Sequence, residues 1–164
     1  MASKTDFTPE EWSQIRKSPM MASVAVVAAS PSGPVGVIKE MFAVGKLIAE
    51  TKTKSGHNGL VDALVADITT REGMEQAKPE EIKGMKPEQV RGHAVDALKS
   101  VAALVDRKAP GDAAEFKSWL QTVAQRVPNA SKEGGFLGIG GTLVSEQEQA
   151  ALKDTASALG VAES

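Results

Sequence analysis

The stretch Pro19–Ile48, PMMASVAVVAASPSGPVGVIKEMFAVGKLI, is the most apolar part of the sequence and decides the fold class. Its first part, Met20–Ala29, is apolar apart from Ser23, so a helix built from it must be covered on most sides. The two prolines and the glycine of Pro31–Pro34 end that helix, because proline removes a backbone donor and clashes with the preceding turn. The residues after them have amphipathic spacing to about residue 51. The stretch therefore predicts a helical hairpin around which the rest of the chain packs.

A helix start precedes this hairpin. Thr8 as the N-cap and Glu11 three residues later match the capping box, and Phe7 and Trp12 occupy the positions of a hydrophobic staple. Because Pro19 follows so soon, we expect this first helix to be short and a new helix to begin at Pro19.

The remaining chain carries further helix signals. They predict helices or helical turns from Leu60 to about Gly73 with Asp62 and Asp67 outward, between Pro79 and Pro87, from Pro87 to about Arg107, from a capping box at Asp112 to a stop at Pro128, and from Ser145 to Leu159. Apart from Thr142–Val144, no run has the alternation of a β-strand. The sequence thus predicts an all-α, single-domain bundle of about six or seven helices.

The domain is expected to cover residues 7–160, with flexible termini at 1–6 and 161–164. A short repeat lies inside it: Ser23–Ala25 recurs as Ser100–Ala102, and a Pro/Gly loop and an amphipathic helix follow each copy. If the repeat is real, the bundle consists of two pseudo-symmetric helical hairpins. The alternative is that two Ala/Val-rich hairpins resemble each other by chance.

Composition excludes several kinds of chemistry. The 164 residues include no Cys, which removes disulfides, thiol nucleophiles and Cys zinc sites, and is compatible with the cytoplasm, where we expect the protein. The net charge of −2 provides no basic footprint for nucleic acid. Met20–Ala29 is shorter than the roughly 20 apolar residues of a membrane span, so we expect no integral membrane segment. A signal peptide is the weaker alternative, because the run begins late and acidic residues offset Arg16 and Lys17.

Two histidines are the candidates for metal chemistry. His93 and Asp96 are three residues apart on the predicted helix from Pro87, so they share a face and can supply two metal ligands. The alternative is a surface histidine beside a solvated aspartate, since no third ligand stands at a diagnostic spacing. His57 lies in a Gly/Asn loop and fits a turn better than a catalytic base. No nucleophile elbow is present, so the sequence indicates neither catalytic residues nor a cofactor.

The glycine-rich loop Gly134–Gly141 carries three apolar side chains, Phe136, Leu137 and Ile139. It lacks the preceding strand of a dinucleotide loop and the Gly-Lys-Ser/Thr of a P-loop. We expect its apolar side chains to be buried under the bundle, with the glycines permitting positive φ. The alternative is that the three side chains project and contact a protein partner or a membrane surface.

The last segment resembles a known family. The residues Gly140-Gly141-Thr-Leu-Val-Ser145-Glu-Gln-Glu148, followed by a helix that ends at Leu159-Gly160, resemble the helix entry of the tellurite-resistance TerB-like family. Residues 28–33, with Glu40 after them, resemble that family's first such turn. The resemblance implies an all-α bundle of paired hairpins linked to stress response, to membrane-associated complexes and to metal binding by acidic clusters. The family's turn usually has Asp before Gly, where this chain has Ser32 and Gly140, so no ligands are carried over.

These observations predict a non-enzymatic helical interaction or stress-associated module, acting with an unidentified protein partner or as a homo-oligomer. The first alternative is a metal-binding or hydrolytic domain that uses His93, Asp96 and nearby carboxylates. The second is peripheral membrane association through the 134–141 loop.

Overall fold

A computed structural model of the chain describes residues 1–29, 44–52, 59–133 and 144–162, and for 129–133 the backbone alone. The described residues form helices without any strand: α1 (Pro9–Val27), a helical segment at 44–52, α3 (Gly59–Ile68), α4 (Arg71–Gln76), α5 (Pro87–Lys108), α6 (Pro110–Glu133) and α7 (Glu146–Leu159), with short 3₁₀ turns η1 (Lys4–Asp6) and η2 (Glu80–Ile82). The predicted all-α bundle of about six or seven helices is confirmed.

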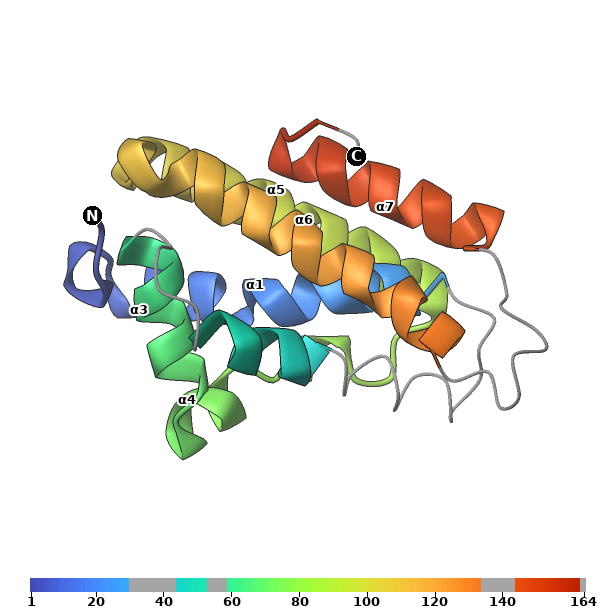
Figure 1. Cartoon of the computed structure of the whole chain (residues 1–164), viewed down its shortest axis with the longest axis horizontal. Helices are drawn as coiled ribbons and strands as arrows, with labels where there is room; N and C mark the ends of the chain where they lie inside the picture. Colours follow the sequence, from blue (N-terminus) through green and yellow to red (C-terminus); the bar gives the residue numbers. More distant parts are fainter. Residues whose placement is uncertain (30–43, 53–58, 134–143, 163–164) are drawn as a thin grey trace.

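Helix α1 is the centre of the bundle. It packs against α5, α6 and α7 on one side and against α3 and α4 on the other, as Figure 1 shows. Its residues Trp12, Ile15 and Val26 are buried, as are Leu98 of α5 and Phe116 of α6. Helix α7 lies over α5 and α6 at the top of the view in Figure 1. The apolar run Met20–Ala29 therefore contributes to the central helix, as its composition predicts.

Helix α1 continues through Pro19, so the prediction of a short first helix and a new start at Pro19 is wrong. Proline at this position has no N–H for the carbonyl oxygen of Ile15, four residues earlier. The hydroxyl of Ser18 replaces that donor, since Ser18 Oγ donates to the Ile15 carbonyl at 2.7 Å in a buried setting. The carbonyl that proline would leave unsatisfied is thereby paired, and one long helix forms where the sequence pattern suggested two.

Replacing Ser18 with Ala should lower the free energy of unfolding by about 1–3 kcal/mol, because the buried Ile15 carbonyl loses its donor. Urea denaturation measures the change. The control is the double variant Ser18→Ala/Pro19→Ala, which returns a backbone N–H to residue 19 and should recover most of the loss. Equal stability of the single and double variants would contradict this account of the helix.

Helix α6 also differs from its predicted bounds. It begins at Pro110, two residues before the expected cap, and it runs through Pro128 to Glu133. Asp112 lies inside the helix, where its Oδ2 accepts from the backbone N–H of Ala2 at 2.6 Å and of Leu60 at 3.1 Å. Pro128 is buried, so its packing against the bundle overrides the local preference for a break.

The remaining caps follow the prediction. Thr8 and Glu11 form the capping box that starts α1, and Ser145 and Glu148 form the one that starts α7. Gly160 ends α7 with φ of 66°, a left-handed conformation that glycine adopts without strain. The rings of the predicted staple, Phe7 and Trp12, lie with centroids 5.9 Å apart. Helix α3, however, ends at Ile68, and a separate helix α4 follows it.

Two predictions about organisation are not decided by this structure. The first of the two proposed pseudo-symmetric hairpins includes residues 30–43, which lie outside the described residues, so the pseudo-symmetry stays a prediction. The flexibility of residues 1–6 is a statement about motion and also stays a prediction. The structure places Lys4 against α3, where its Nζ lies 3.0 Å from Asp67 Oδ1.

Candidate functional site: an apolar groove

A groove lies between the second half of α1, the helical segment 44–52, the end of α3 and α4. Its cavity volume is about 370 Å³, within the range of small-molecule sites. Apolar residues from all four elements form most of its lining, among them Pro19, Met20, Val44, Ile48, Ile68 and Met74. We call these residues, with the polar side chains described below, the apolar groove.

Arg16 lines the apolar groove with only 10% of its side chain exposed. Its Nε donates to Asp67 Oδ2 at 2.6 Å, and its Nη1 donates to Gln76 Oε1 in α4. Asp67 also accepts from Trp12 Nε1 at 2.8 Å and from Lys4 Nζ at 3.0 Å. One carboxylate therefore joins η1, α1 and α3, and Arg16 extends this network to α4.

Asp67 is not the outward-facing residue that the periodicity of α3 predicts. Its side chain is 15% exposed and faces α1. Burial alone would raise the pKa of the Asp67 carboxyl, but the hydrogen bonds from Arg16, Trp12 and Lys4 outweigh it and lower the pKa below its usual value. The carboxylate is thus held ionised in a structural network.

The two remaining polar side chains of the apolar groove are also paired. Lys78 Nζ lies 2.8 Å from Glu75 Oε1. Thr69 Oγ1 donates to the Val65 carbonyl at 2.8 Å and accepts from Lys52 Nζ at 3.2 Å. The three polar side chains among the described lining residues therefore have partners within the protein, and most of the described lining is apolar.

The short connection between α3 and α4 determines the position of Met74 in the apolar groove. Thr70 caps α4, accepting from Gly73 N at 2.9 Å, and donates to the Asp67 carbonyl at 2.7 Å. A Cβ on Gly73 would lie 2.0 Å from that same carbonyl oxygen. Only glycine permits this approach, which brings α4 against the end of α3 and places Met74 and Ala77 beside the α1 surface.

His93 lies elsewhere, in a cleft of about 330 Å³ between α1 and α5 that Ser13, Lys17 and Glu81 also line. Lys17 Nζ lies 3.1 Å from Glu81 Oε2 across this cleft. Burial raises the pKa of Glu81, but its own backbone amide and Lys17 outweigh that effect and lower it.

Asp96 does not join His93 in that cleft. It is exposed on α5, with Oδ1 3.7 Å from Lys99 Nζ. Within the described ranges, no three His, Asp or Glu side chains form a group that could hold a metal ion. The metal site at His93 and Asp96 stays a prediction, and this part of the structure supplies no third ligand for it.

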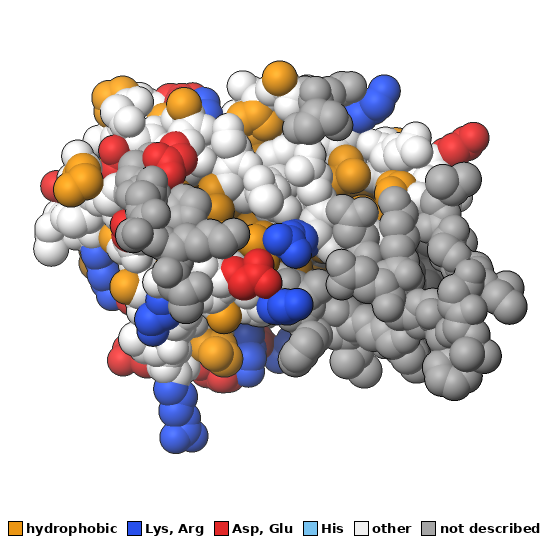
Figure 2. Space-filling model, viewed as in Figure 1, with side chains coloured by type: hydrophobic (Ala, Val, Ile, Leu, Met, Phe, Trp, Pro, Cys, Tyr) orange, Lys and Arg blue, Asp and Glu red, His pale blue; other side chains and the backbone are white. Residues whose placement is uncertain are grey.

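The predicted contact residues Phe136, Leu137 and Ile139 lie outside the described residues, so their exposure and their contact with a partner or membrane stay predictions. None of the helices in the described part of the chain combines the length and apolar character that crossing a membrane requires. On the face drawn in Figure 2, hydrophobic side chains are scattered among acidic and basic ones, and neither charge gathers into a single patch.

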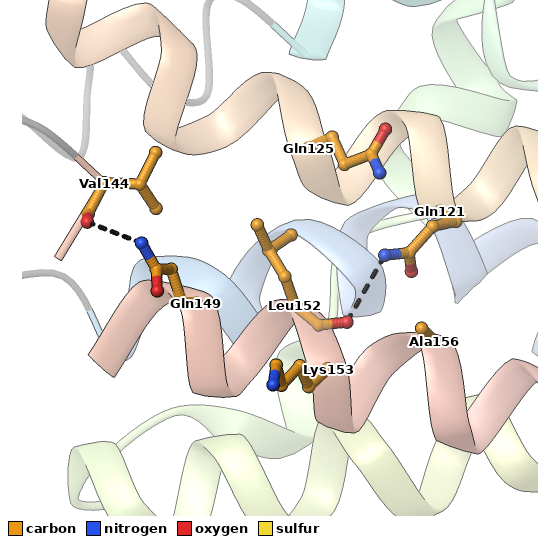
Figure 3. A pocket seen from close by; sticks show the side chains of 7 residues that line it. All are labelled: Gln121, Gln125, Val144, Gln149, Leu152, Lys153 and Ala156. Carbon is orange, nitrogen blue, oxygen red and sulfur yellow. Dashed lines mark hydrogen bonds between the residues drawn. The ribbon is translucent and has the colours of Figure 1, made fainter. Parts of the chain in front are cut away.

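A third hollow, of about 330 Å³, lies between α6 and α7 (Figure 3). Its walls carry Gln121 and Gln125 from α6 and Gln149 and Leu152 from α7. Gln121 Nε2 donates to the Leu152 carbonyl at 3.3 Å, while Gln121 Oε1 is buried without a hydrogen-bond partner among the described residues. The sequence pattern does not predict this feature, because glutamine on an amphipathic helix is usually exposed.

The comparisons with family models, curated proteins and solved structures find no match to this chain. The three hollows described above are therefore the candidate sites. The apolar groove is the most hydrophobic of them, and it is built at the junction of the most elements.

Proposed function

We propose that this chain is a non-enzymatic helical interaction module of the cytoplasm that binds an apolar group in the apolar groove. The observation that carries the proposal is the composition of the lining: it is apolar, and its polar side chains Arg16, Thr69 and Lys78 are already paired. Exposed apolar surface in a concave site is typical of binding sites.

The methionines of the groove support the same role. Met20 is half-buried and Met74 is 59% exposed, although a thioether side chain gains from burial. Methionine side chains adapt their shape to different apolar partners and are common on binding surfaces. The resemblance of Gly140–Gly160 to the TerB-like helix entry supports a stress-associated setting for this binding role.

Titration with Nile red, a neutral dye that fluoresces in apolar sites, tests the proposal. The wild-type protein should bind the dye saturably, and Ile48→Glu should weaken binding by about tenfold or more, because a carboxylate in the groove must lose its hydration to accommodate the dye. Ala103→Glu is the matched control: it places the same charge at an exposed position of α5 and should leave binding unchanged.

Thermal melts without dye establish that both variants are folded. Equal dye affinity in wild type and Ile48→Glu would remove the groove as the binding site. Equal weakening by Ala103→Glu would show that net charge, and not the groove, controls the affinity.

A further inference from the structure

We propose that the hollow between α6 and α7 is a second binding site, separate from the apolar groove, and that it takes a small neutral primary amide. The amide N–H of this ligand pairs with the side chain of Gln121. Figure 3 shows the hollow, with Gln121 and Gln125 on α6 and with Gln149 and Leu152 on α7.

Gln121 is buried, with only 5% of the residue exposed. Its Nε2 donates to the Leu152 carbonyl at 3.3 Å, while its Oε1 has no hydrogen-bond partner among the described residues. Buried carboxamides normally have both groups paired, because an unpaired buried acceptor loses its hydration without replacement. Within the described ranges, no other buried side-chain nitrogen or oxygen lacks a partner. The unpaired oxygen thus sets Gln121 apart from the rest of the interior.

Packing between α6 and α7 does not require this carboxamide. Leu152 lies inside α7, where the backbone N–H of Ala156 is the regular helical partner of its carbonyl. The added bond from Gln121 is longer than the usual distance of about 2.9–3.0 Å. A methionine at residue 121 has similar length and flexibility, and it would fill the same space without an unpaired acceptor. A ligand that pairs with Oε1 accounts for the glutamine, and helix packing does not.

The groups that Gln121 offers indicate the class of the ligand. Besides the acceptor Oε1, its Nε2 carries a second N–H next to the one given to Leu152. A primary amide matches both, since its N–H donates to Oε1 and its carbonyl accepts from Nε2. The apolar side chains of Val144, Leu152 and Ala156 suit a short aliphatic body. The volume of about 330 Å³ is that of a small-molecule site.

A ligand reaches Oε1 through a turn of the Gln121 carboxamide. In the structure Oε1 is buried, and Figure 3 shows it directed from α6 toward α7. The last torsion of a glutamine side chain is broad, and the hydrogen bond to Leu152 that opposes the turn is long. A turn of the carboxamide therefore presents Oε1 to the hollow that this side chain lines, where an amide N–H can pair with it.

The test uses isobutyramide as the probe and the methyl signals of Leu152 in ¹³C NMR as the reporter. These signals should shift saturably when isobutyramide is added to the wild-type protein. The matched probe is 3-methyl-2-butanone, which has the same shape but a methyl group in place of the NH₂ group. It should bind at least about fivefold more weakly, because it cannot donate to Oε1.

Gln121→Met should weaken isobutyramide binding by about fivefold or more. Without the probe it should melt at the same temperature as wild type or higher, because the unpaired acceptor is gone. Gln147→Met is the matched control: Gln147 is exposed on α7 and does not line the hollow, so this variant should bind isobutyramide as wild type does. If Gln121→Met does not fold, Gln121→Asn, which withdraws the carboxamide by one methylene group, should also weaken binding.

Equal affinity for isobutyramide and the ketone would overturn the class of the ligand, and no saturable shift with isobutyramide would overturn the site. Unchanged isobutyramide affinity in a folded Gln121→Met variant would overturn the role of Gln121, as would a melting temperature clearly below that of wild type. Ile48→Glu alters the apolar groove and should leave isobutyramide binding unchanged. Loss of isobutyramide binding in that variant would overturn the separation of the two sites.

Discussion

Replacing Asp67 with Ala should lower the free energy of unfolding by about 3 kcal/mol, because Arg16 loses the carboxylate that pairs it in a largely buried site. The value is at the lower end for buried pairs because 15% of the Asp67 side chain stays exposed. Trp12 Nε1 also loses its acceptor. Urea denaturation measures the loss of free energy of unfolding.

Asp62→Ala is the matched control, since Asp62 is exposed on the same helix. It should change the free energy of unfolding by less than about 0.5 kcal/mol.

The effect of Asp67→Ala should depend on pH in a direction that the lowered pKa of Asp67 determines. A carboxyl whose pKa is lower in the folded state stabilises the protein fully above its unfolded pKa of about 3.9, and this stabilisation disappears as the pH falls through the folded pKa. The stability gap between wild type and Asp67→Ala should therefore be constant from pH 7 to about pH 5 and shrink below pH 4. A gap that stays constant down to acid unfolding would contradict the ionised role assigned to Asp67.

Replacing Val26 with Asp should destabilise the protein by at least about 4 kcal/mol, a large part of the stability of an ordinary domain. Val26 is fully buried in α1 and belongs to the hydrophobic core cluster, so a carboxylate at this position would lose its hydration. Loss of the helical circular-dichroism signal at 25 °C, or a strongly lowered denaturation midpoint, is the expected result.

Val24→Asp is the matched control for Val26→Asp, because Val24 lies two residues away in the same helix and is half-buried. Its carboxylate can keep part of its hydration, so the cost should be less than half that at Val26. Equal costs at the two positions would mean that α1 does not present Val26 to the core. The apolar run Met20–Ala29 does not distinguish these positions by itself, since it is apolar nearly all round.

The helix ends show which local features can be predicted from sequence. The capping boxes at Thr8 and at Ser145 and the left-handed Gly160 each depend on residues within about four positions of one another, so the local sequence contains all the interacting groups. The all-α class follows from the same signals together with the spacing of apolar residues.

The two prolines show where local rules fail. Proline interrupts an isolated helix, yet α1 continues through Pro19 because Ser18 satisfies the Ile15 carbonyl, and α6 continues through Pro128 where it is buried against the bundle. The local rule considers the lost backbone hydrogen bond, but it does not include the hydrogen bond from a neighbouring hydroxyl or the stabilisation from tertiary packing. Contacts between distant residues are also the reason why Asp67 was predicted to be exposed: its partners Trp12 and Arg16 are more than fifty residues away along the chain.

The sequence by itself determined that this chain forms a helical bundle with a central apolar helix, because caps and apolar periodicity act between residues that are close in the chain. The tertiary structure alone decided where the proposed binding site lies. The apolar groove joins Met20, Ile48 and Met74 from three separate segments, and no spacing along the chain relates them. Asp67 illustrates the difference: in the sequence its spacing predicts an outward-facing residue, and in the folded protein it pairs with Arg16 and Trp12 of α1.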